Sequence, residues 1–174
     1  MAAESLRVLI PEDRLQARIG ELGRQIREDY GDAPVLCIGV LKGSFLFMAD
    51  LVRAIGGDVR CDFLSASSYH GGTRSSGTVT INFDVSSPIE GLHCLVVEDI
   101  VDTGRTLSHL LERLSARGPK SLKTVALLDK PSRREVDMDP DYVGFSIPDE
   151  FVVGFGLDLA ERFRNLPHIA VYRP

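Results

Sequence analysis

The chain has 174 residues, of which 44% are hydrophobic and 26% charged, and its formal net charge is -5. This length is typical of one domain that buries a core without disulfides or a structural metal. The acidic balance provides no general basic surface for nucleic acid, which argues against a primary DNA- or RNA-binding role.

The first residues and the cysteines bear on the cellular compartment in which the protein is expected. Met1–Glu4 are small or acidic, unlike the basic and then apolar start of a signal peptide. No apolar run approaches the ~18–20 residues of a membrane span. Cys37, Cys61 and Cys94 form no CxxC pair, so we expect three reduced, buried core residues. The scattered histidines predict no histidine-built metal site, and the expected location is the cytoplasm, away from membranes.

Helices and strands are predicted to alternate along the chain. Pro11, followed by two carboxylates, begins a helix that ends near Tyr30-Gly31, with apolar residues on one face. The other predicted helices are residues 45–55 and 106–117. The predicted strands are residues 35–40, 62–66, 78–83, 92–97 and 123–128, with weaker candidates at 142–147 and 151–155. This alternation favours an α/β fold with an open, mainly parallel sheet flanked by helices.

Residues 65–77, with the sequence SASSYHGGTRSSG, interrupt the alternation. The segment is polar, rich in Ser and Gly, and longer than most connections within compact domains. Loops of this length are usually functional or disordered. Because a predicted strand follows at residues 78–83, we expect a hairpin-like flexible flap.

The most informative segment is the turn that follows the predicted strand 92–97. Residues 102–106, with the sequence DTGRT, offer backbone N–H groups and two hydroxyls just before a helix, an arrangement that suits a phosphate monoester. Glu98 and Asp99 would repel a lone anion, but they suit a ribose diol or a divalent cation. The combination points to a phosphorylated sugar. The alternative is a surface loop with a capped helix start. Neither GxxxxGK[ST] nor a GxGxxG after a strand occurs.

The sequence VVEDIVDTGRTL of residues 96–107 resembles the phosphoribosyl pyrophosphate signature of type I phosphoribosyltransferases. Four more segments resemble those of the hypoxanthine-guanine branch in the expected order: residues 41–44, 68–69, 129–131 and 148–158. The resemblance spans roughly residues 8–170. It implies one domain over residues 1–174, with a core at about 15–147, a flexible loop at 65–77, and a small base-binding hood from residues 148–174 and the N-terminal segment.

The resemblance implies that phosphoribosyl pyrophosphate and Mg²⁺ are bound. Glu98 and Asp99 would bind the ribose hydroxyls, and the pyrophosphate would contact Lys42, Gly43 and Arg164, with Arg162 a competitor for the arginine role. The 5′-phosphate would be held by Thr103, Gly104, Arg105 and Thr106. Asp158, with Glu98 and Asp99 as further candidates, would coordinate Mg²⁺. A cis peptide between Leu41 and Lys42 is also implied.

The same resemblance assigns the acceptor side. Asp102 would be the general base near N7 of the purine if partial desolvation makes its ionised form less stable, and helix capping is its alternative role. Lys130 would donate to O6, a bond that adenine cannot accept, and the alternative is a solvated lysine beside Arg133 and Arg134. Phe151 would stack on the base and Val152 would read its edge through backbone groups, unless the segment is ordinary core.

Ser68 and Tyr69 would close over the site as part of the flap, because water would trap an oxocarbenium-like transition state. The implied reaction is purine salvage, in which hypoxanthine, and with it guanine, becomes IMP or GMP with release of pyrophosphate. The family implies a homodimer or homotetramer. Two alternatives remain, a phosphoribosyltransferase for another base such as xanthine, uracil or orotate, and an RNA-binding regulator on the same fold.

Overall fold

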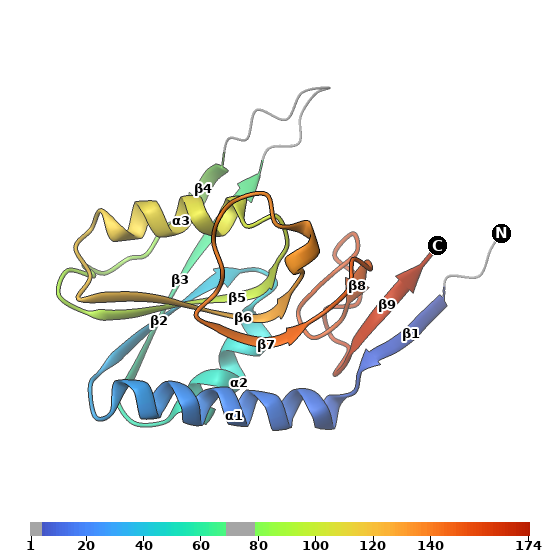
Figure 1. Ribbon diagram of the computed structural model, residues 1–174, viewed down its shortest axis with the longest axis horizontal. Coiled ribbons are helices and arrows are strands. Elements are labelled where there is room, and N and C mark those ends of the chain that lie inside the picture. The colour runs from blue at the N-terminus through green and yellow to red at the C-terminus, as the bar shows by residue number, and fades with distance from the viewer. Residues whose placement is uncertain (1–4, 69–78) are drawn as a thin grey trace.

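The computed structural model describes residues 5–68 and 79–174, and of Ser68 only the main chain (Figure 1). Its main sheet has the strand order β4-β3-β2-β5-β6-β7, in which only β4 runs antiparallel to its neighbour. The strands are β2 (Val35–Leu41), β3 (Val59–Ser68), β4 (Val79–Phe83), β5 (His93–Val101), β6 (Ser121–Asp129) and β7 (Tyr142–Ser146). The predicted open, mainly parallel sheet is therefore confirmed.

Helices cover both faces of this sheet. In Figure 1, α1 (Glu12–Tyr30) and α2 (Phe45–Ile55) lie below it and α3 (Arg105–Ser115) lies above it. Successive residues of β2 accordingly alternate between two cores: Cys37 packs on the α1 and α2 side, whereas Leu36 and Ile38 pack on the α3 side. Strands buried on both faces read as continuous apolar runs, which is why residues 35–40 were recognisable. No helix of the described residues is long and apolar enough to span a membrane.

The first helix follows its predicted bounds closely. Pro11 precedes α1 in extended conformation, and its carbonyl accepts the N–H of Leu15 at 3.0 Å. The buried side chains Leu15, Ile19, Leu22 and Ile26 recur at spacings of three and four, the period of one helix face. Burial of each large aliphatic side chain contributes roughly 1.5–3 kcal/mol. Gly31 then ends the helix with a positive φ of 57°.

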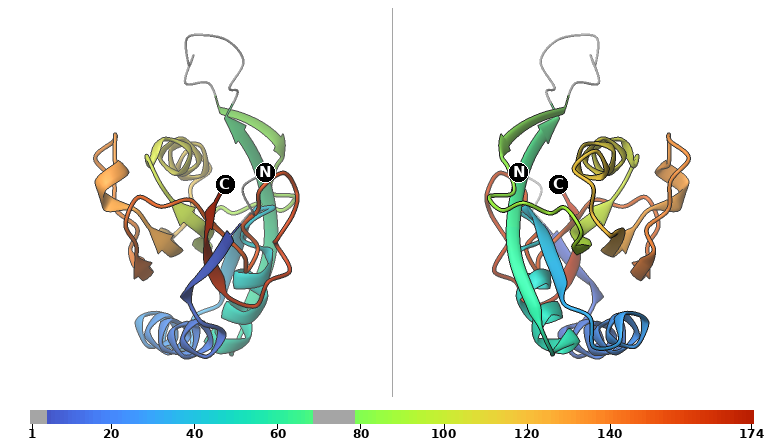
Figure 2. Two further views of the ribbon diagram at one scale, coloured as in Figure 1. Left: turned by 90° about the vertical axis from the view of Figure 1, so that its right-hand side faces the viewer. Right: turned by 90° about the vertical axis from the view of Figure 1, so that its left-hand side faces the viewer.

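A second, three-stranded sheet of order β1-β9-β8 forms the hood. It joins β1 (Ser5–Ile10) to β9 (Ile169–Arg173) and β8 (Val152–Val153), so the described ends of the chain lie side by side (Figure 1). Viewed from that end in Figure 2, the hood stands in front of the main sheet and its helices. The sequence did not predict β1 or β9 as strands, and the candidate strand at 151–155 proved shorter.

Three other expectations need correction. Strand β5 continues through Glu98 and Asp99 to Val101, so the two acids are strand residues and not loop residues. Strand β3 extends to Ser68, so the first four residues of the expected loop 65–77 belong to the strand, while residues 69–77, Tyr69 included, lie outside the described residues. Cys61 is exposed, although Cys37 and Cys94 are buried as expected.

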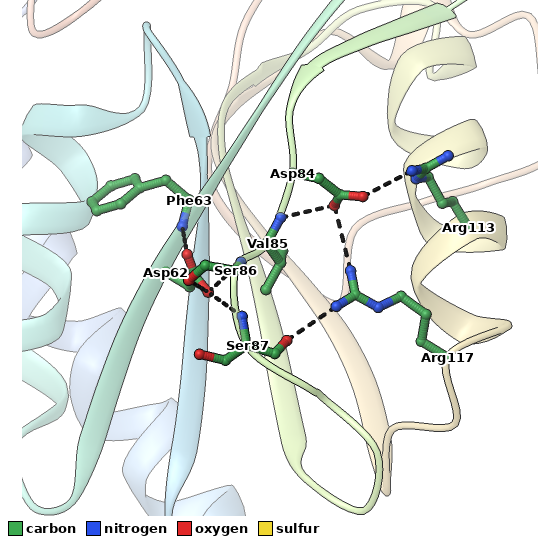
Figure 3. A network of polar contacts seen from close by, with 8 residues as sticks. All are labelled: Asp62, Phe63, Asp84, Val85, Ser86, Ser87, Arg113 and Arg117. Atoms are coloured by element: carbon green, nitrogen blue, oxygen red, sulfur yellow. Dashed lines mark hydrogen bonds and ion pairs between the residues drawn. The ribbon is translucent and has the colours of Figure 1, made fainter.

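A polar network fixes the segment that follows β4 (Figure 3). The buried Asp62 carboxylate of β3 accepts the backbone N–H of Ser86 at 3.0 Å and the Ser86 hydroxyl at 3.1 Å. Asp84 pairs with Arg113 at 2.8 Å and with Arg117 at 3.4 Å, both on the α3 side. The hydrogen bond from Arg113 lowers the pKa of Asp84 below its usual value. The base of the β3–β4 hairpin is thereby tied to α3.

Candidate active site

Three adjoining hollows open at the carboxyl ends of β2, β5 and β6, and Ile100 lines all three. We call them the turn hollow (about 110 Å³, beside residues 102–107), the carboxylate hollow (about 290 Å³, between residues 40–43 and the two acids of β5) and the lysine hollow (about 280 Å³, beside Lys130). Parallel sheets bind their ligands at this edge. The hollows also bring together residues that lie more than a hundred positions apart in the sequence.

The turn hollow is lined by Thr103, Gly104 and Thr106 at the start of α3. Gly104 adopts the left-handed conformation, with φ 82°, and the first turn of α3 follows it directly. The N–H groups of a first helical turn lack partners within the helix and attract anions. Arg105 is the exception among the predicted residues, because its guanidinium pairs with Glu135 at 2.6 Å and does not line the hollow.

The carboxylate hollow is lined by Glu98 and Asp99, which are successive residues of β5. Only 7% of Glu98 is exposed. Burial, followed by the charge of Asp99, raises the pKa of Glu98 well above its usual value. Burial likewise raises the pKa of Asp99 to about 6, against the opposing charge of Arg164. Both acids, the buried Glu98 and the partly buried Asp99, therefore hold a proton more readily than exposed acids do until a cation or a hydrogen-bonding ligand arrives.

Opposite the acids, the loop after β2 presents Lys42 and Gly43 to the same hollow. The Leu41–Lys42 peptide is cis. A Cβ on Gly43 would overlap the Asp99 carboxylate, so only glycine allows this approach. Lys42 Nζ pairs with Glu161 at 3.1 Å, and both side chains are 66% exposed. Lys42 is thus held at the rim of the hollow by a weak surface pair.

Arg164 lines the carboxylate hollow on its third side. Its guanidinium donates to the Gly156 carbonyl at 2.7 Å and pairs with Asp158 at 3.0 Å. Arg162, the competing candidate, lies over the ring of Phe163, 4.7 Å from its centroid. The structure therefore places Arg164, and not Arg162, beside Lys42.

The lysine hollow joins the predicted base-binding residues to Asp102. Only 8% of the Lys130 side chain is exposed, and its Nζ lies 3.7 Å from Asp149. Phe151 is 52% exposed and forms a T-shaped ring pair with Tyr172, at 6.2 Å between ring centroids. The Val152 side chain is buried in the hood, where β8 pairs with β9, so only its backbone is available to a ligand.

The Asp102 side chain is 44% exposed, and Arg133 Nε donates to its Oδ1 at 3.1 Å. The desolvation expected for a general base is therefore not present in this structure. A purine that fills the lysine hollow would exclude water from this side chain. Arg134, only 12% exposed, donates to the Asp102 carbonyl at 2.8 Å and pairs with buried Asp129 at 2.6 Å.

The three candidate metal ligands line the carboxylate hollow together. Within residues 5–67 and 79–174, however, no three acidic, histidine or cysteine side chains converge as a ready-made cage. Asp158 contributes to the raised pKa of Asp99, which places these two carboxylates near each other. Mg²⁺ usually binds one or two carboxylates together with substrate phosphates and water, and Asp99 and Asp158 fit that coordination preference.

Sequence reasoning missed several residues of the site. Ile100 lines every hollow, Leu157 lines the lysine hollow, and Asp149 and Arg133 lie beside Lys130 and Asp102. The sequence did signal Arg133, as one of two arginines close to Lys130. It was named only as a neighbour in the alternative that Lys130 is solvated. Ser68 ends β3, and the predicted lid residue Tyr69 is outside the described part of the chain.

Comparisons with known proteins agree with this geometry. Residues 11–160 match the family model of the phosphoribosyl transferase domain. A hypoxanthine-guanine phosphoribosyltransferase of Staphylococcus aureus (strain Mu50 / ATCC 700699) is 49% identical over 167 residues, which cover 96% of this chain and 93% of the relative. A bifunctional protein TilS/HprT of Listeria monocytogenes serotype 4b (strain F2365) is 51% identical over 97% of this chain, but the match spans only 26% of that protein.

Among solved structures, a hypoxanthine-guanine phosphoribosyltransferase from Bacillus anthracis, determined with a HEPES molecule in its active site, superposes with a TM-score of 0.92. It is 49% identical in sequence, and the alignment covers 96% of this chain and 99% of that one. Family model, relatives and fold all point the same way. The chain belongs to the phosphoribosyltransferase family, alongside its hypoxanthine-guanine members.

Proposed function

We propose that this chain transfers the 5-phosphoribosyl group of phosphoribosyl pyrophosphate to hypoxanthine, and also to guanine, yielding IMP or GMP and pyrophosphate. The observation that supports it most is the adjacency of the three hollows around Ile100. One has the chemistry of a phosphate site, the next that of a sugar and cation site, and the third that of a purine site. Their order matches the order of groups along a nucleotide.

On the donor side, the backbone of Thr103, Gly104 and Thr106 receives the 5′-phosphate at the start of α3. Glu98 and Asp99 accept hydrogen bonds from the ribose hydroxyls. Arg105 contributes backbone and long-range charge only, because its side chain is engaged by Glu135. Donor binding therefore depends mainly on main-chain N–H groups, which are fixed in place before the ligand arrives.

The pyrophosphate lies across the mouth of the carboxylate hollow, between Lys42, Gly43 and Arg164. Asp158 and Asp99 are the carboxylates that would hold Mg²⁺ against it, and Glu98 lies behind them in a more buried position. When bound, Mg²⁺ neutralises charge on the pyrophosphate and makes it a better leaving group. Lys42 and Arg164 add to the same neutralisation from the protein side.

On the acceptor side, the purine enters the lysine hollow against Phe151. Lys130 donates to O6, and the backbone of Val152 meets the opposite edge of the base. The Lys130 ammonium is buried and pairs with Asp149 on one side, so a base without an acceptor at position 6 would leave its N–H group on the base side without a partner. This cost is the reason to expect 6-oxopurines to be preferred over adenine.

In the transfer step, N9 of the purine forms a bond to C1 of the ribose as the bond from C1 to pyrophosphate breaks. Electrons flow from the base to the ribose and leave with pyrophosphate. The proton on N7 goes to the Asp102 carboxylate, which then returns it to solvent. Ser68 and Tyr69 would shield the ribosyl cation from water, as the resemblance implies.

We expect a homodimer or homotetramer. Leu6, Val8, Phe45 and Phe83 are exposed large apolar side chains outside the site, and such surfaces often mark contacts between subunits. Light scattering after gel filtration would establish the assembly. All three cysteines are free thiols, in keeping with a reducing compartment, and the cytoplasm is the proposed location.

A panel of bases tests the proposal. The purified chain, Mg²⁺ and phosphoribosyl pyrophosphate are offered hypoxanthine, guanine, xanthine, adenine and uracil in separate reactions, and release of pyrophosphate is followed. Turnover of hypoxanthine and guanine, and little of adenine, is expected. Turnover of uracil alone, or of no base, would refute it. Omission of Mg²⁺ with added chelator should abolish the reaction.

A further inference from the structure

A chain of alternating charges links the two residues on the acceptor side of the site. Lys130 Nζ lies 3.7 Å from Asp149 Oδ1, and Asp149 Oδ2 lies 3.7 Å from Arg133 NH1. Arg133 Nε then donates to Asp102 Oδ1 at 3.1 Å. A single guanidinium therefore spans two carboxylates, that of the proposed base Asp102 and that of Asp149 beside the purine-reading lysine.

We propose that Arg133 is a positioning residue that orients the Asp102 carboxylate and couples it, through Asp149, to Lys130. This inference rests on the proposed function, because it assigns Asp102 and Lys130 the roles given above. Arg133 itself does not line the lysine hollow, so it acts on the reaction through Asp102 and not by contact with the base.

An exposed ion pair is usually worth little, because both side chains must be immobilised to form it. Here the main chain places both partners. The N–H of Arg133 donates to the Lys130 carbonyl at 3.0 Å, and the N–H of Lys130 donates to the Val101 carbonyl at 2.9 Å. Arg134 NH1 holds the Asp102 carbonyl at 2.8 Å. The distance between the Arg133 and Asp102 backbones is thus set before their side chains meet.

The geometry of the guanidinium explains why an arginine suits this place. Its N–H donors lie in a rigid planar fork, so Nε and NH1 can each meet a different carboxylate without rearrangement. Lysine would offer one mobile point charge. A general base must lie within hydrogen-bond reach of the proton that it accepts, and small misplacements slow turnover severely. Arg133 restricts Asp102 to the orientation that faces the hollow.

Arg133 is the charged group that orients the Asp102 carboxylate, through the hydrogen bond from its Nε. The other charged groups near this carboxylate are Lys130, Asp99 and Asp158 of the same hollow, together with Arg134 and Asp149. Among the residues that the structure describes, Arg133 is the one that forms an ion pair with the Asp102 carboxylate. Its loss should therefore leave the Asp102 carboxylate free to rotate away from the hollow.

Arg133→Gln is the test, with Arg24→Gln as its matched control, since Arg24 is an exposed arginine on α1 remote from the hollows. Steady-state rates with hypoxanthine are measured against both substrates over a range of pH. We expect R133Q to lower kcat by about tenfold, part of the roughly 10²–10⁴ that general-base catalysis supplies. KM for phosphoribosyl pyrophosphate should stay within about twofold, because a positioning role for Asp102 leaves donor binding intact.

Arg133→Lys is a second variant in case R133Q fails to fold, and it should recover only part of kcat, because lysine offers one mobile charge in place of the planar fork. Asp149→Asn completes a double-mutant cycle: coupling predicts that D149N slows turnover in the wild type and adds little in R133Q. R133Q kinetics equal to those of R24Q, or purely additive effects with D149N, would overturn the inference while wild-type turnover upholds the proposed function. A wild-type chain that uses no 6-oxopurine would overturn both.

Discussion

Gly43 lies so close to Asp99 that a single added methyl group would occupy the position of the Asp99 carboxylate. The two residues come from different strands: Gly43 follows β2, and Asp99 lies within β5. Since β2 and β5 are adjacent and parallel, their carboxyl ends meet at the same edge of the sheet. The fit between this glycine and this acid defines the wall of the carboxylate hollow.

Gly43→Ala should therefore displace Asp99 and disable the donor site. We expect kcat/KM for phosphoribosyl pyrophosphate to fall by about tenfold or more, because a displacement near 1 Å has that scale of effect. Gly20→Ala is the control, since its nearest neighbour is the mobile end of Arg24 at 3.6 Å and α1 gains roughly 0.5–1 kcal/mol from alanine. Equal donor kinetics for G43A and wild type would contradict the tight approach.

Asp99→Asn should stabilise the protein without ligands at neutral pH. Burial raises the pKa of Asp99 to about 6 from 3.8, so the folded state holds its proton more tightly than the unfolded state. The stability that this proton contributes is complete below the unfolded value and is lost as the pH rises through the folded value. At pH 7.5 the ionised acid thus lowers the free energy of unfolding, by up to roughly 3 kcal/mol.

Urea unfolding of wild type and D99N at pH 4 and pH 7.5, without Mg²⁺ or donor, measures this effect. D99N should be the more stable protein at pH 7.5, and the difference should shrink towards pH 4. Glu98, whose pKa is also raised by burial, would leave some of the same pH dependence in the mutant. A difference that is independent of pH would contradict the burial of an ionised Asp99.

The donor half of the site was predictable because it is local in sequence. Residues 98–106 run from the end of β5 through the turn into α3, so one segment carries most of the groups. In this segment, apolar residues are followed by acids and then by Thr-Gly-Arg-Thr. That order indicates first the edge of the sheet and then the start of a helix. The main sheet was equally predictable from the sequence, since strands buried on both faces are almost wholly apolar.

The resemblance implied a hood, but its strands and the links between segments could not be predicted from the pattern of residues. Strand β1 is exposed at its first four residues, so it shows neither an apolar run nor a buried face, and its partner β9 lies at the other end of the chain. Asp149 reaches Lys130 only because β7 returns the chain to β6. The sequence named Arg133 and Arg134 only as neighbours of Lys130, yet Arg133 is half-exposed at Asp102 and Arg134 is largely covered at Asp129.

Asp102→Asn should lower kcat by roughly 10²–10⁴, the usual contribution of a general base, because the amide cannot accept the N7 proton. Binding of phosphoribosyl pyrophosphate should change by less than about twofold, since the main-chain turn is retained. Isothermal titration with the donor and steady-state rates with hypoxanthine separate the two effects. Asp32→Asn, an exposed acid beyond α1, is the control. Full turnover by D102N would remove Asp102 from the base role.

Arg134→Met should destabilise the fold itself. Arg134 and Asp129 are 12% and 8% exposed, so removal of the arginine leaves a buried carboxylate without its partner. Loss of one partner of a buried pair typically costs about 3–5 kcal/mol, whereas replacement of both by apolar residues is often nearly neutral. Urea unfolding should thus show a large loss in R134M and a much smaller one in the double variant R134M/D129L. Equal losses in both would show that the ion pair is not the cause.

Lys130→Met should reduce discrimination between bases more than it reduces donor binding. Methionine retains the length of the side chain and fills the lysine hollow, but it cannot donate to O6. We expect kcat/KM for hypoxanthine to fall by about 10²-fold or more, because the base loses the bond that the buried ammonium supplied. Adenine, which never made that bond, should lose far less, so the ratio of the two bases narrows. Lys120→Met, at an exposed position before β6, should change neither rate. An unaltered hypoxanthine-to-adenine ratio in K130M would show that the base is recognised elsewhere, and the backbone of Val152 would then be the next group to examine.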